Sequence, residues 1–294
     1  AEEAAGPSEV TVTLTDVGFD TPITLNCSCS QADFAKYTKI LRKTFKENNK
    51  RFDQYHAYKN MNNLYTLNHE AYKHPVQMDS TFIDCLKLAI KMQSKNSQFD
   101  ISQGALLNLW HDARENTQVP PSDDMIQEAL KHIDLKNIQI NKNEVSYLDS
   151  ELSIDLGAIA KGYTAQLAKE ALNKAGLKNG YINAGGNVVL LGEKEDGSNW
   201  KIGIQSPDSS DALVQYETKE ATCLVTSGDY QRYFTYKHKK YSHIIDPKTG
   251  YPANYVRSVT VITKDSGKAD ALSTTLFCMS VEDGKKYLST LDYD

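Results

Sequence analysis

Asp270 and Thr274 form a pair whose side-chain types and spacing suggest chemistry. They lie four positions apart in the stretch Lys268 to Met279, which predicts a helix, so their oxygens share one face about a turn apart. A carboxylate and a hydroxyl so placed suit a hard cation such as Mg²⁺, which keeps waters and phosphate oxygens as further ligands. An aspartate favoured by the helix dipole and a threonine bonded back to a carbonyl would give the same pattern.

A second candidate is the stretch from Asp155 to Gly162, Asp-Leu-Gly-Ala-Ile-Ala-Lys-Gly. It follows an apolar extended run and leads into residues 160–175, where the apolar spacing predicts a helix that stops at Gly176. The first N–H groups of such a helix are unpaired and can receive a phosphate, and Lys161 adds a cation there. A capped helix with a surface lysine explains this stretch equally well.

His243 lies in Ser-His-Ile-Ile-Asp-Pro, at the end of a predicted hairpin strand. A neutral imidazole can accept a hydroxyl proton near pH 7, and a carboxylate such as Asp246 could orient the ring. Six other histidines stand in ordinary polar settings, and a single histidine is more often structural than catalytic. The residue pattern alone therefore leaves the role of His243 open.

Five stretches rich in small, polar and glycine residues follow one another over about the last half of the chain. In order they read DLGAIAKGY, NAGGN, TSGDYQRYF, SHIIDPKTGYP and ADALSTTLF. Such residues at strand ends are where α/β proteins place ligands. Taken in this order, the stretches resemble the bacterial flavin transferases of the ApbE-like family, which move FMN from FAD onto a protein threonine.

The resemblance implies roles for particular residues. It places Mg²⁺ ligands on Asp270, Thr274 and the main-chain carbonyl of Ala158, and a general base on His243. It places FAD contacts on Tyr55, Gln98, Phe99, Asp100, Asp155, Lys161 and Ile244. From the residues alone, Tyr55 could be an ordinary tyrosine at the rim of a pocket, and Asp100 could be an N-terminal helix cap.

The implied activity is that of an Mg²⁺-dependent FAD:protein FMN transferase. Such an enzyme cleaves FAD, joins FMN through a phosphoester bond to a threonine of an acceptor in a flavin-based electron-transfer system, and releases AMP. The same parts would serve a flavin pyrophosphatase, in which water replaces the threonine, or a flavin-binding exported protein without turnover. The segment Asp196-Gly-Ser-Asn departs at the threonine from the Asp-Gly-x-Thr motif of the family's targets, so we do not expect this chain to be flavinylated itself.

Composition and charge exclude several other classes of protein. The net charge of -5 and the pI near 5.8 offer no basic surface for nucleic acid. No stretch approaches the roughly 20 apolar residues of a membrane span. The five cysteines include no Cys-x-x-Cys pair, so we expect neither a metal-thiolate site nor a disulfide framework. Cys27 and Cys29 alternate in a predicted strand and should point to one face.

The first residues, 1–9, are small, acidic and contain a proline. We interpret them as a linker that follows a removed signal or anchor segment, ahead of one large flavin transferase domain over residues 10–294. This interpretation predicts an extracytoplasmic protein held at the cell membrane by a lipid anchor outside the chain. A cloning remnant would have a similar composition.

Local patterns place these residues on helices and short strands. A strand pair is predicted over residues 10–25, a long helix after Ser30, and a surface loop from Asp53 to Asn68. Helices are predicted from Ser80 to Ser94 and from Ser122 to Ile133, and two more close the chain from Lys268. Further short strands are predicted at 138–140, 145–148, 181–183, 188–191, 200–205, 221–226, 233–236, 240–245 and 258–263. Helices and strands are thus partly segregated along the chain. This favours an α+β fold with mixed, mostly antiparallel sheets and packed helices in one large domain.

Overall fold

A computed structural model describes residues 6–292, beginning with an antiparallel strand pair. β1 (Ser8–Leu14) pairs with β2 (Ile23–Cys29). Positive φ angles at Gly18, Phe19 and Asp20 reverse the chain between them. β1 starts ahead of the predicted boundary at residue 10, while residues 1–5 of the predicted linker lie outside the described part of the chain.

The strand pair belongs to a six-stranded antiparallel sheet. Its order is β1-β2-β6-β7-β10-β13. The four further strands are β6 (Tyr181–Ala184), β7 (Asn187–Leu190), β10 (Cys223–Gly228) and β13 (Ser258–Thr263). Alternate residues of β2 are buried, and the sulfurs of Cys27 and Cys29 lie 3.7 Å apart on one face, as the alternation predicts.

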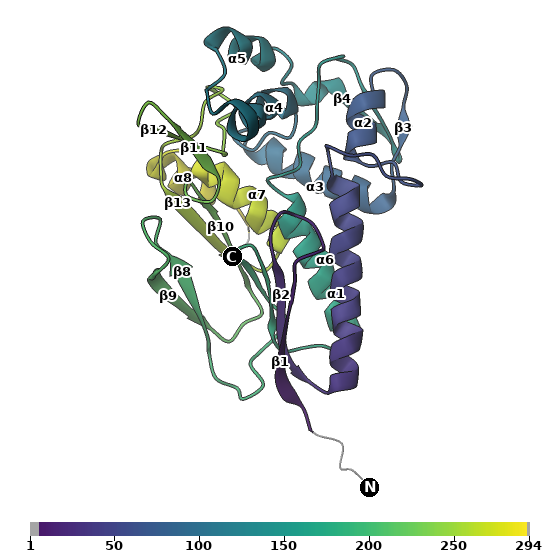
Figure 1. The fold of residues 1–294 in the computed structure, drawn as a ribbon, viewed down its shortest axis with the longest axis vertical. Helices are drawn as coiled ribbons and strands as arrows, with labels where there is room; N and C mark the ends of the chain where they lie inside the picture. Colours follow the sequence, from purple (N-terminus) through teal and green to yellow (C-terminus); the bar gives the residue numbers. More distant parts are fainter. Residues whose placement is uncertain (1–5, 293–294) are drawn as a thin grey trace.

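Three helices cover one face of this sheet (Figure 1): α1 (Gln31–Phe52), α6 (Ala160–Lys174) and α7 (Ser266–Phe277). Ser30 caps α1, because its hydroxyl accepts the N–H of Asp33. Tyr37, Leu41 and Phe45 of α1 are buried against apolar residues of the strands, as their helical spacing predicts. Helices on one side of an antiparallel sheet define the predicted α+β class.

A second core lies at the end of the molecule farther from the N-terminus (Figure 1). It contains α2 (Leu64–Glu70), β3 (Val76–Gln77), α3 (Ser80–Lys95), β4 (Ile138–Asn141), β5 (Glu144–Tyr147) and α8 (Val281–Leu288). The predicted loop from Asp53 to Asn68 is therefore shorter than expected, because α2 begins at Leu64 with Asn63 as its cap. The helix α3 begins at the predicted Ser80, and its cap is Asp79, whose carboxylate accepts the N–H of Phe82, so Ser80 itself is not the cap.

A third group of elements surrounds Trp110. It consists of α4 (Gly104–Asp112), a π-helical turn (Ala113–Thr117), α5 (Asp123–Leu130) and the hairpin of β11 (Tyr233–Tyr236) and β12 (Lys239–Ser242). A 3₁₀ turn (Leu135–Asn137) follows α5 and packs Leu135 against the second core. The Trp110 indole stacks on Tyr241 and donates its N–H to the carbonyl of Gly250 at 2.8 Å. This contact ties the stretch that contains His243 to α4.

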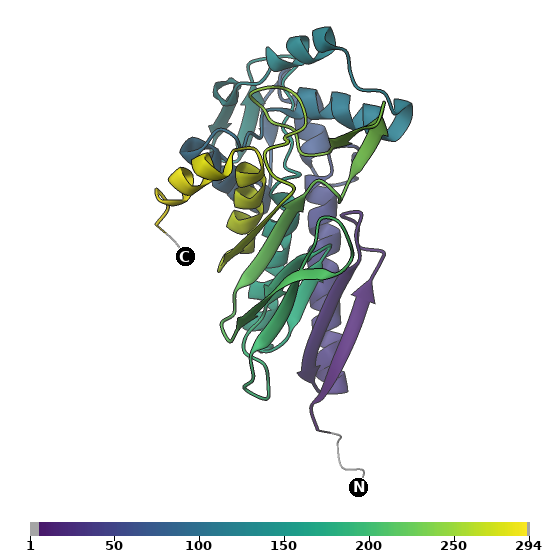
Figure 2. The same ribbon diagram turned by 90° about the vertical axis from the view of Figure 1, so that its left-hand side faces the viewer.

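The hairpin of β8 (Trp200–Gln205) and β9 (Ala212–Thr218) forms a separate two-stranded ribbon (Figures 1 and 2). β9 was not predicted, because its residues are largely exposed and lack a buried alternation. Within residues 6–292, no helix has the length and apolar character needed to cross a membrane.

Candidate functional site

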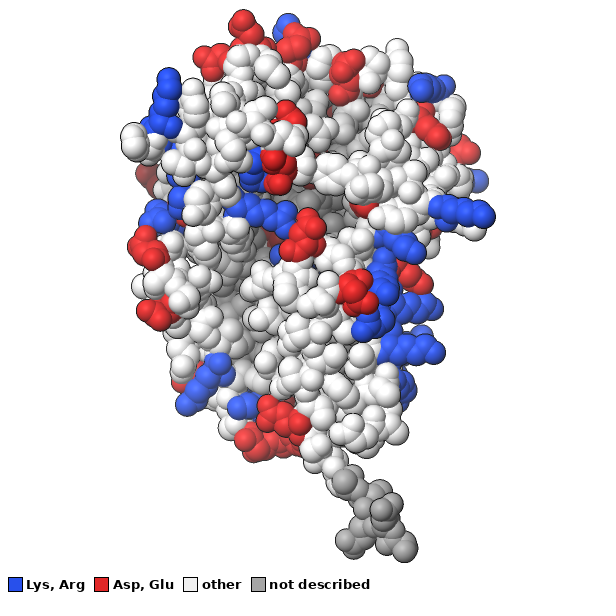
Figure 3. All heavy atoms as spheres, viewed as in Figure 1, with Lys and Arg blue, Asp and Glu red and all other residues white. Residues whose placement is uncertain are grey.

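One cavity of about 1030 Å³ brings the predicted site residues together. All eleven of them line it: Tyr55, Gln98, Phe99, Asp100, Asp155, Ala158, Lys161, His243, Ile244, Asp270 and Thr274. They come from loops and helices that are far apart in the sequence. In the space-filling view the centre of this face is hollowed (Figure 3).

The first turn of α6 lies against α7 at the middle of the cavity. The N–H of Gly162 donates to Oδ2 of Asp270 at 2.8 Å. A Cβ at position 162 would lie 2.4 Å from the carbonyl oxygen of Ser266 and 2.5 Å from Cβ of Asp270. Only glycine permits this approach. One of the N–H groups expected to receive phosphate is therefore already taken by a carboxylate.

Asp270 is a buried carboxylate with one hydrogen-bond donor among the described residues, the N–H of Gly162. Burial raises its pKa from 3.8 to about 6, although the nearby Lys161 ammonium favours the charged form. A cation bound at Oδ1, the carboxylate oxygen that does not accept from Gly162, would stabilise this buried negative charge. Thr274 lies one turn further along α7 and the carbonyl of Ala158 precedes α6, and both line the same cavity.

These donors fit a hard, oxygen-seeking cation. The described residues contain no cluster of three or more His, Cys, Asp or Glu side chains that could hold a metal alone. The site instead offers one carboxylate, one hydroxyl and one carbonyl. That set is incomplete by itself and suits Mg²⁺, which retains waters and substrate phosphate oxygens.

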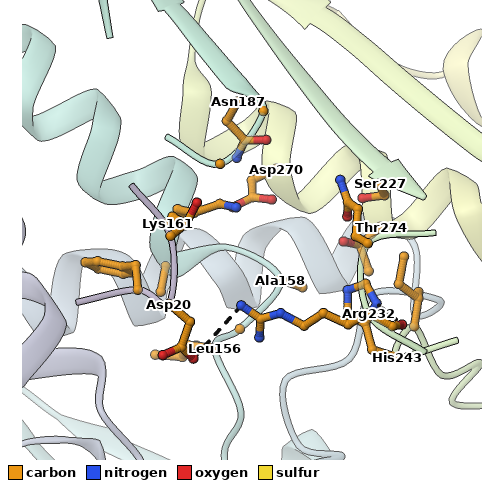
Figure 4. Close-up of a pocket in the computed structure, with 18 of the residues that line it drawn as sticks. Asp20, Leu156, Ala158, Lys161, Asn187, Ser227, Arg232, His243, Asp270 and Thr274 are labelled. Atoms are coloured by element: carbon orange, nitrogen blue, oxygen red, sulfur yellow. Dashed lines mark hydrogen bonds and ion pairs between the residues drawn. The ribbon is translucent and has the colours of Figure 1, made fainter. Parts of the chain in front are cut away.

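Lys161 extends from α6 into the cavity and points toward Asp270 (Figure 4). Its burial lowers the pKa of the ammonium, with Asp270 acting in the opposite direction. A Cβ at Gly185, where φ is +59°, would lie 3.1 Å from the Lys161 nitrogen. The glycine at position 185, in the stretch Asn183–Asn187, therefore leaves room for the Lys161 ammonium group.

His243 follows β12, and main-chain contacts determine its orientation. Its Nδ1 lies 3.1 Å from the carbonyl oxygen of Arg232, which can only accept, so Nδ1 carries the proton and Nε2 keeps a free lone pair. Burial is the main cause that lowers the pKa of His243 to about 4. The hydrogen bond to the Arg232 carbonyl acts in the opposite direction, and the charge of the Arg232 guanidinium lowers the pKa further. The ring is therefore neutral at pH 7 and able to take a proton.

The suggestion that Asp246 orients His243 is wrong. Asp246 is buried, and its carboxylate accepts hydrogen bonds from the N–H of Lys248 and the hydroxyl of Tyr255. It therefore stabilises the turn after β12, while the carbonyl of Arg232 takes the role expected of a carboxylate.

The remaining predicted contacts lie at the edges of the cavity. Tyr55 is half exposed and stacks on His111, with ring centroids 4.9 Å apart. Asp155 accepts from Gly157 and from Gln54. Asp100 is not a helix cap, because α4 begins at Gly104, and its carboxylate instead accepts from the N–H and the hydroxyl of Ser102.

Three residues of the cavity had no assigned role in the sequence. Gln103 and Asn187 are buried, and each has a side-chain polar atom without a hydrogen-bond partner among the described residues. Arg232 reaches across the cavity to Asp20 at 4.0 Å (Figure 4). Asn187 and Arg232 lie in two of the glycine-containing stretches, which could have indicated them, whereas nothing in the sequence singles out Gln103.

The fold and cavity define an α+β protein with a large ligand site, lined by both polar and apolar side chains, and a neutral histidine in it. A model of the ApbE family matches residues 18–294, and the chain belongs to that family. The predicted family is thus confirmed.

Individual relatives agree with this assignment. The chain is 36% identical over 225 residues to the FAD:protein FMN transferase of Klebsiella pneumoniae (strain 342), and the aligned part covers 74% of this chain and 68% of the relative. It is 33% identical over 236 residues to a Vibrio cholerae protein with the same name, with 79% and 71% coverage.

Solved structures support the same placement. The ApbE protein of Thermotoga maritima superposes with a TM-score of 0.85 at 31% identity, covering 96% of this chain and 90% of that chain. The flavin transferase ApbE of Vibrio cholerae gives 0.81 at 27% identity, with 95% and 90% coverage. These matches confirm the predicted α+β fold over almost the whole chain.

Proposed function

We propose that this chain is a flavin transferase that moves FMN from FAD to a threonine of an acceptor protein and releases AMP, in a reaction that depends on Mg²⁺. Its family and the names of its relatives support the class of enzyme. The observation that carries the proposal is the meeting of His243, Lys161 and Asp270 in one cavity with the other predicted contacts. A site of about 1030 Å³ lies at the upper end of the range of roughly 300 to 1,000 Å³ for small-molecule pockets, as a dinucleotide requires.

The transfer breaks one phosphorus–oxygen bond and forms another. The threonine hydroxyl oxygen attacks the phosphorus of the FMN half of FAD, and the bond from that phosphorus to the AMP phosphate breaks. Nε2 of His243 takes the hydroxyl proton, and AMP leaves with the bridging oxygen. The hydrogen bond from Nδ1 to Arg232 keeps the accepting lone pair on Nε2.

Asp270, Thr274 and the Ala158 carbonyl are the residues that would hold Mg²⁺. When bound, the cation would neutralise charge on the pyrophosphate and on the departing phosphate. Lys161 contributes a second positive charge for a phosphate oxygen. Burial of these groups strengthens their electrostatic effect, since the local dielectric constant is lower than that of water.

One assay separates this function from FAD hydrolysis and from flavin binding without turnover. The protein is incubated with FAD and Mg²⁺, with and without a carrier protein bearing an exposed Asp-Gly-Ala-Thr segment. We expect covalent flavin on the carrier and an equal amount of AMP. AMP and FMN without labelling would indicate a pyrophosphatase, and bound FAD without AMP would indicate a carrier protein.

A location outside the cytoplasm, with a lipid anchor, remains a prediction from the composition of residues 1–9. Fractionation of cells that carry the full gene tests it, and a product found wholly in the cytosol would contradict it.

A further inference from the structure

The cavity has two walls of different character. The FAD contacts that the resemblance implies lie on loops, on α6 and after β12, and none lies on the six-stranded sheet or on the β8–β9 hairpin. The second wall, here called the sheet-side wall, consists of cavity-lining residues from β6, β7, β8, β10, β13 and the Gly185–Gly186 turn. Transfer needs two substrates in one site, and this wall remains for the second.

The sheet-side wall carries no formal charge. Its lining side chains are apolar, amide or hydroxyl groups, such as Val188, Ile204, Asn187 and Thr226. The opposite wall contains Asp100, Asp155 and Arg114, and the Lys161 ammonium lies at the inner end between the two walls, next to Gly185. A pyrophosphate is attracted by cations, whereas an uncharged wall suits a polypeptide main chain, which carries no charge.

β8 offers this wall an unpaired strand edge. It pairs with β9 along one edge, and within the described residues no strand pairs with the other. Ile202 and Ile204 line the cavity and are half-buried. Their partners across the hairpin are Tyr216 and Val214, and Val214 is 52% exposed, so this apolar face is incompletely covered. A free edge beside an apolar face is the arrangement that accepts an added strand.

We propose that the sheet-side wall binds an extended segment of the acceptor protein, whose main chain pairs with the free edge of β8 and brings its threonine to His243. This inference rests on the proposed transfer function. The exposed backbone of Gly203 and the open space around Gly186 allow a second chain to approach closely. Figure 4 shows Asn187 above Asp270 and Ser227 next to Thr274, with His243 below Thr274.

The unpartnered side-chain amide of Asn187 supports binding of the acceptor segment along the sheet-side wall. It is 2% exposed, and its Nδ2 has no partner among the described residues although it lines the cavity. A buried amide without a partner costs free energy unless a ligand satisfies it. A main-chain carbonyl of the acceptor segment would supply the missing acceptor.

The test compares two charge-introducing variants of the same hairpin. Ile204→Asp places a carboxylate on the sheet-side wall, whereas the control Leu213→Asp changes a residue that is 70% exposed and does not line the cavity. With the Asp-Gly-Ala-Thr carrier as probe, we expect KM for the carrier to rise about tenfold or more in Ile204→Asp and to stay unchanged in Leu213→Asp. FAD affinity should be normal in both.

Crosslinking gives a second measurement that does not depend on turnover. The five native cysteines are all buried, so a photoreactive maleimide can be attached at Gln205→Cys on the sheet-side wall or at Gln215→Cys, which lies outside it. We expect the carrier to crosslink from position 205 and not from 215. An unchanged KM in Ile204→Asp, equal crosslinking from both positions, or a loss of FAD affinity in Ile204→Asp would overturn the inference. A wild-type protein that never labels the carrier would instead refute the transfer function itself.

Discussion

Gly162 and Asp270 lie in contact where α6 crosses α7, and the N–H of the glycine donates to the carboxylate at 2.8 Å. The position of the carboxylate is therefore determined by the packing of two helices. Because a Cβ at residue 162 would lie 2.4 Å from the Ser266 carbonyl oxygen, the helices can approach this closely only with glycine there.

Gly162→Ala should accordingly separate the helices and displace Asp270. We expect a loss of about 1 to 3 kcal/mol in the free energy of unfolding, as for overpacked cores, and a weaker apparent affinity for Mg²⁺. Gly284→Ala in α8 is the matched control, since its new Cβ would find its nearest neighbour at an ordinary 3.4 Å. Urea unfolding and Mg²⁺ titration of activity measure both quantities. Normal Mg²⁺ dependence in Gly162→Ala would show that the helix contact does not position the carboxylate.

Asp270→Asn should abolish Mg²⁺-dependent turnover and yet stabilise the metal-free protein at neutral pH. The raised pKa of about 6, against 3.8 when unfolded, means that the folded state binds this proton more tightly. The corresponding stability is present below about pH 4 and lost as the pH rises through 6. Asparagine carries no charge to bury, and its side-chain oxygen can still accept from the N–H of Gly162. We therefore expect the free energy of unfolding of the metal-free protein to rise on the order of 2 to 3 kcal/mol at pH 7. Denaturation of both proteins with chelator at pH 4 and pH 7 tests it, and equal stabilities at pH 7 would contradict the burial argument.

His243→Ala should lower turnover by about 10² to 10⁴-fold while FAD binds at nearly the original affinity, since the base acts only in the transition state. In the wild type the pKa of this ring is lowered to about 4. The unfolded chain binds the proton first as the pH falls, so stability is lost progressively between about pH 6.5 and 4 and stays lost below that. Proton NMR of the ring gives its midpoint directly. A midpoint near 6.5, or outright loss of FAD binding in His243→Ala, would count against the assigned role.

Lys161→Ala should affect binding first. Its ammonium reaches the middle of the cavity, and loss of a charge-assisted hydrogen bond to phosphate weakens binding by roughly 1.5 to 3 kcal/mol. Lys169→Ala is the control on the same helix, because that lysine donates to the carbonyl of Ala221 and does not line the cavity. Titration of FAD by its fluorescence compares the two, and equal affinities would remove Lys161 from the phosphate site.

The parts of this structure that the sequence predicts are those with a local cause. The face of α1 formed by Tyr37, Leu41 and Phe45 follows from helical spacing alone, and Ser30 marks the start of that helix. The meeting of the site residues in one cavity was predicted only through the resemblance, because no local pattern links Tyr55 to Asp270.

The missed features depend on tertiary contacts. β9 lacks a buried alternation because its hairpin stands apart from the sheet. Asp246 follows His243 closely in sequence, yet the turn directs its carboxylate to Lys248 and Tyr255. The partner of the histidine is a carbonyl oxygen, which every residue type carries, so no sequence pattern could have revealed it.

That carbonyl belongs to Arg232, and both the N–H and Nδ1 of His243 are directed to it at 3.0 and 3.1 Å. No replacement of the Arg232 side chain can delete this contact, so the tautomer of the base is protected from point mutation at its orienting partner. A triad whose histidine depends on an aspartate side chain can be disabled by a single codon change at that aspartate. Here the residue at position 232 can be substituted without loss of the carbonyl oxygen that orients His243. Only an insertion, a deletion or a distorted hairpin would misalign the base.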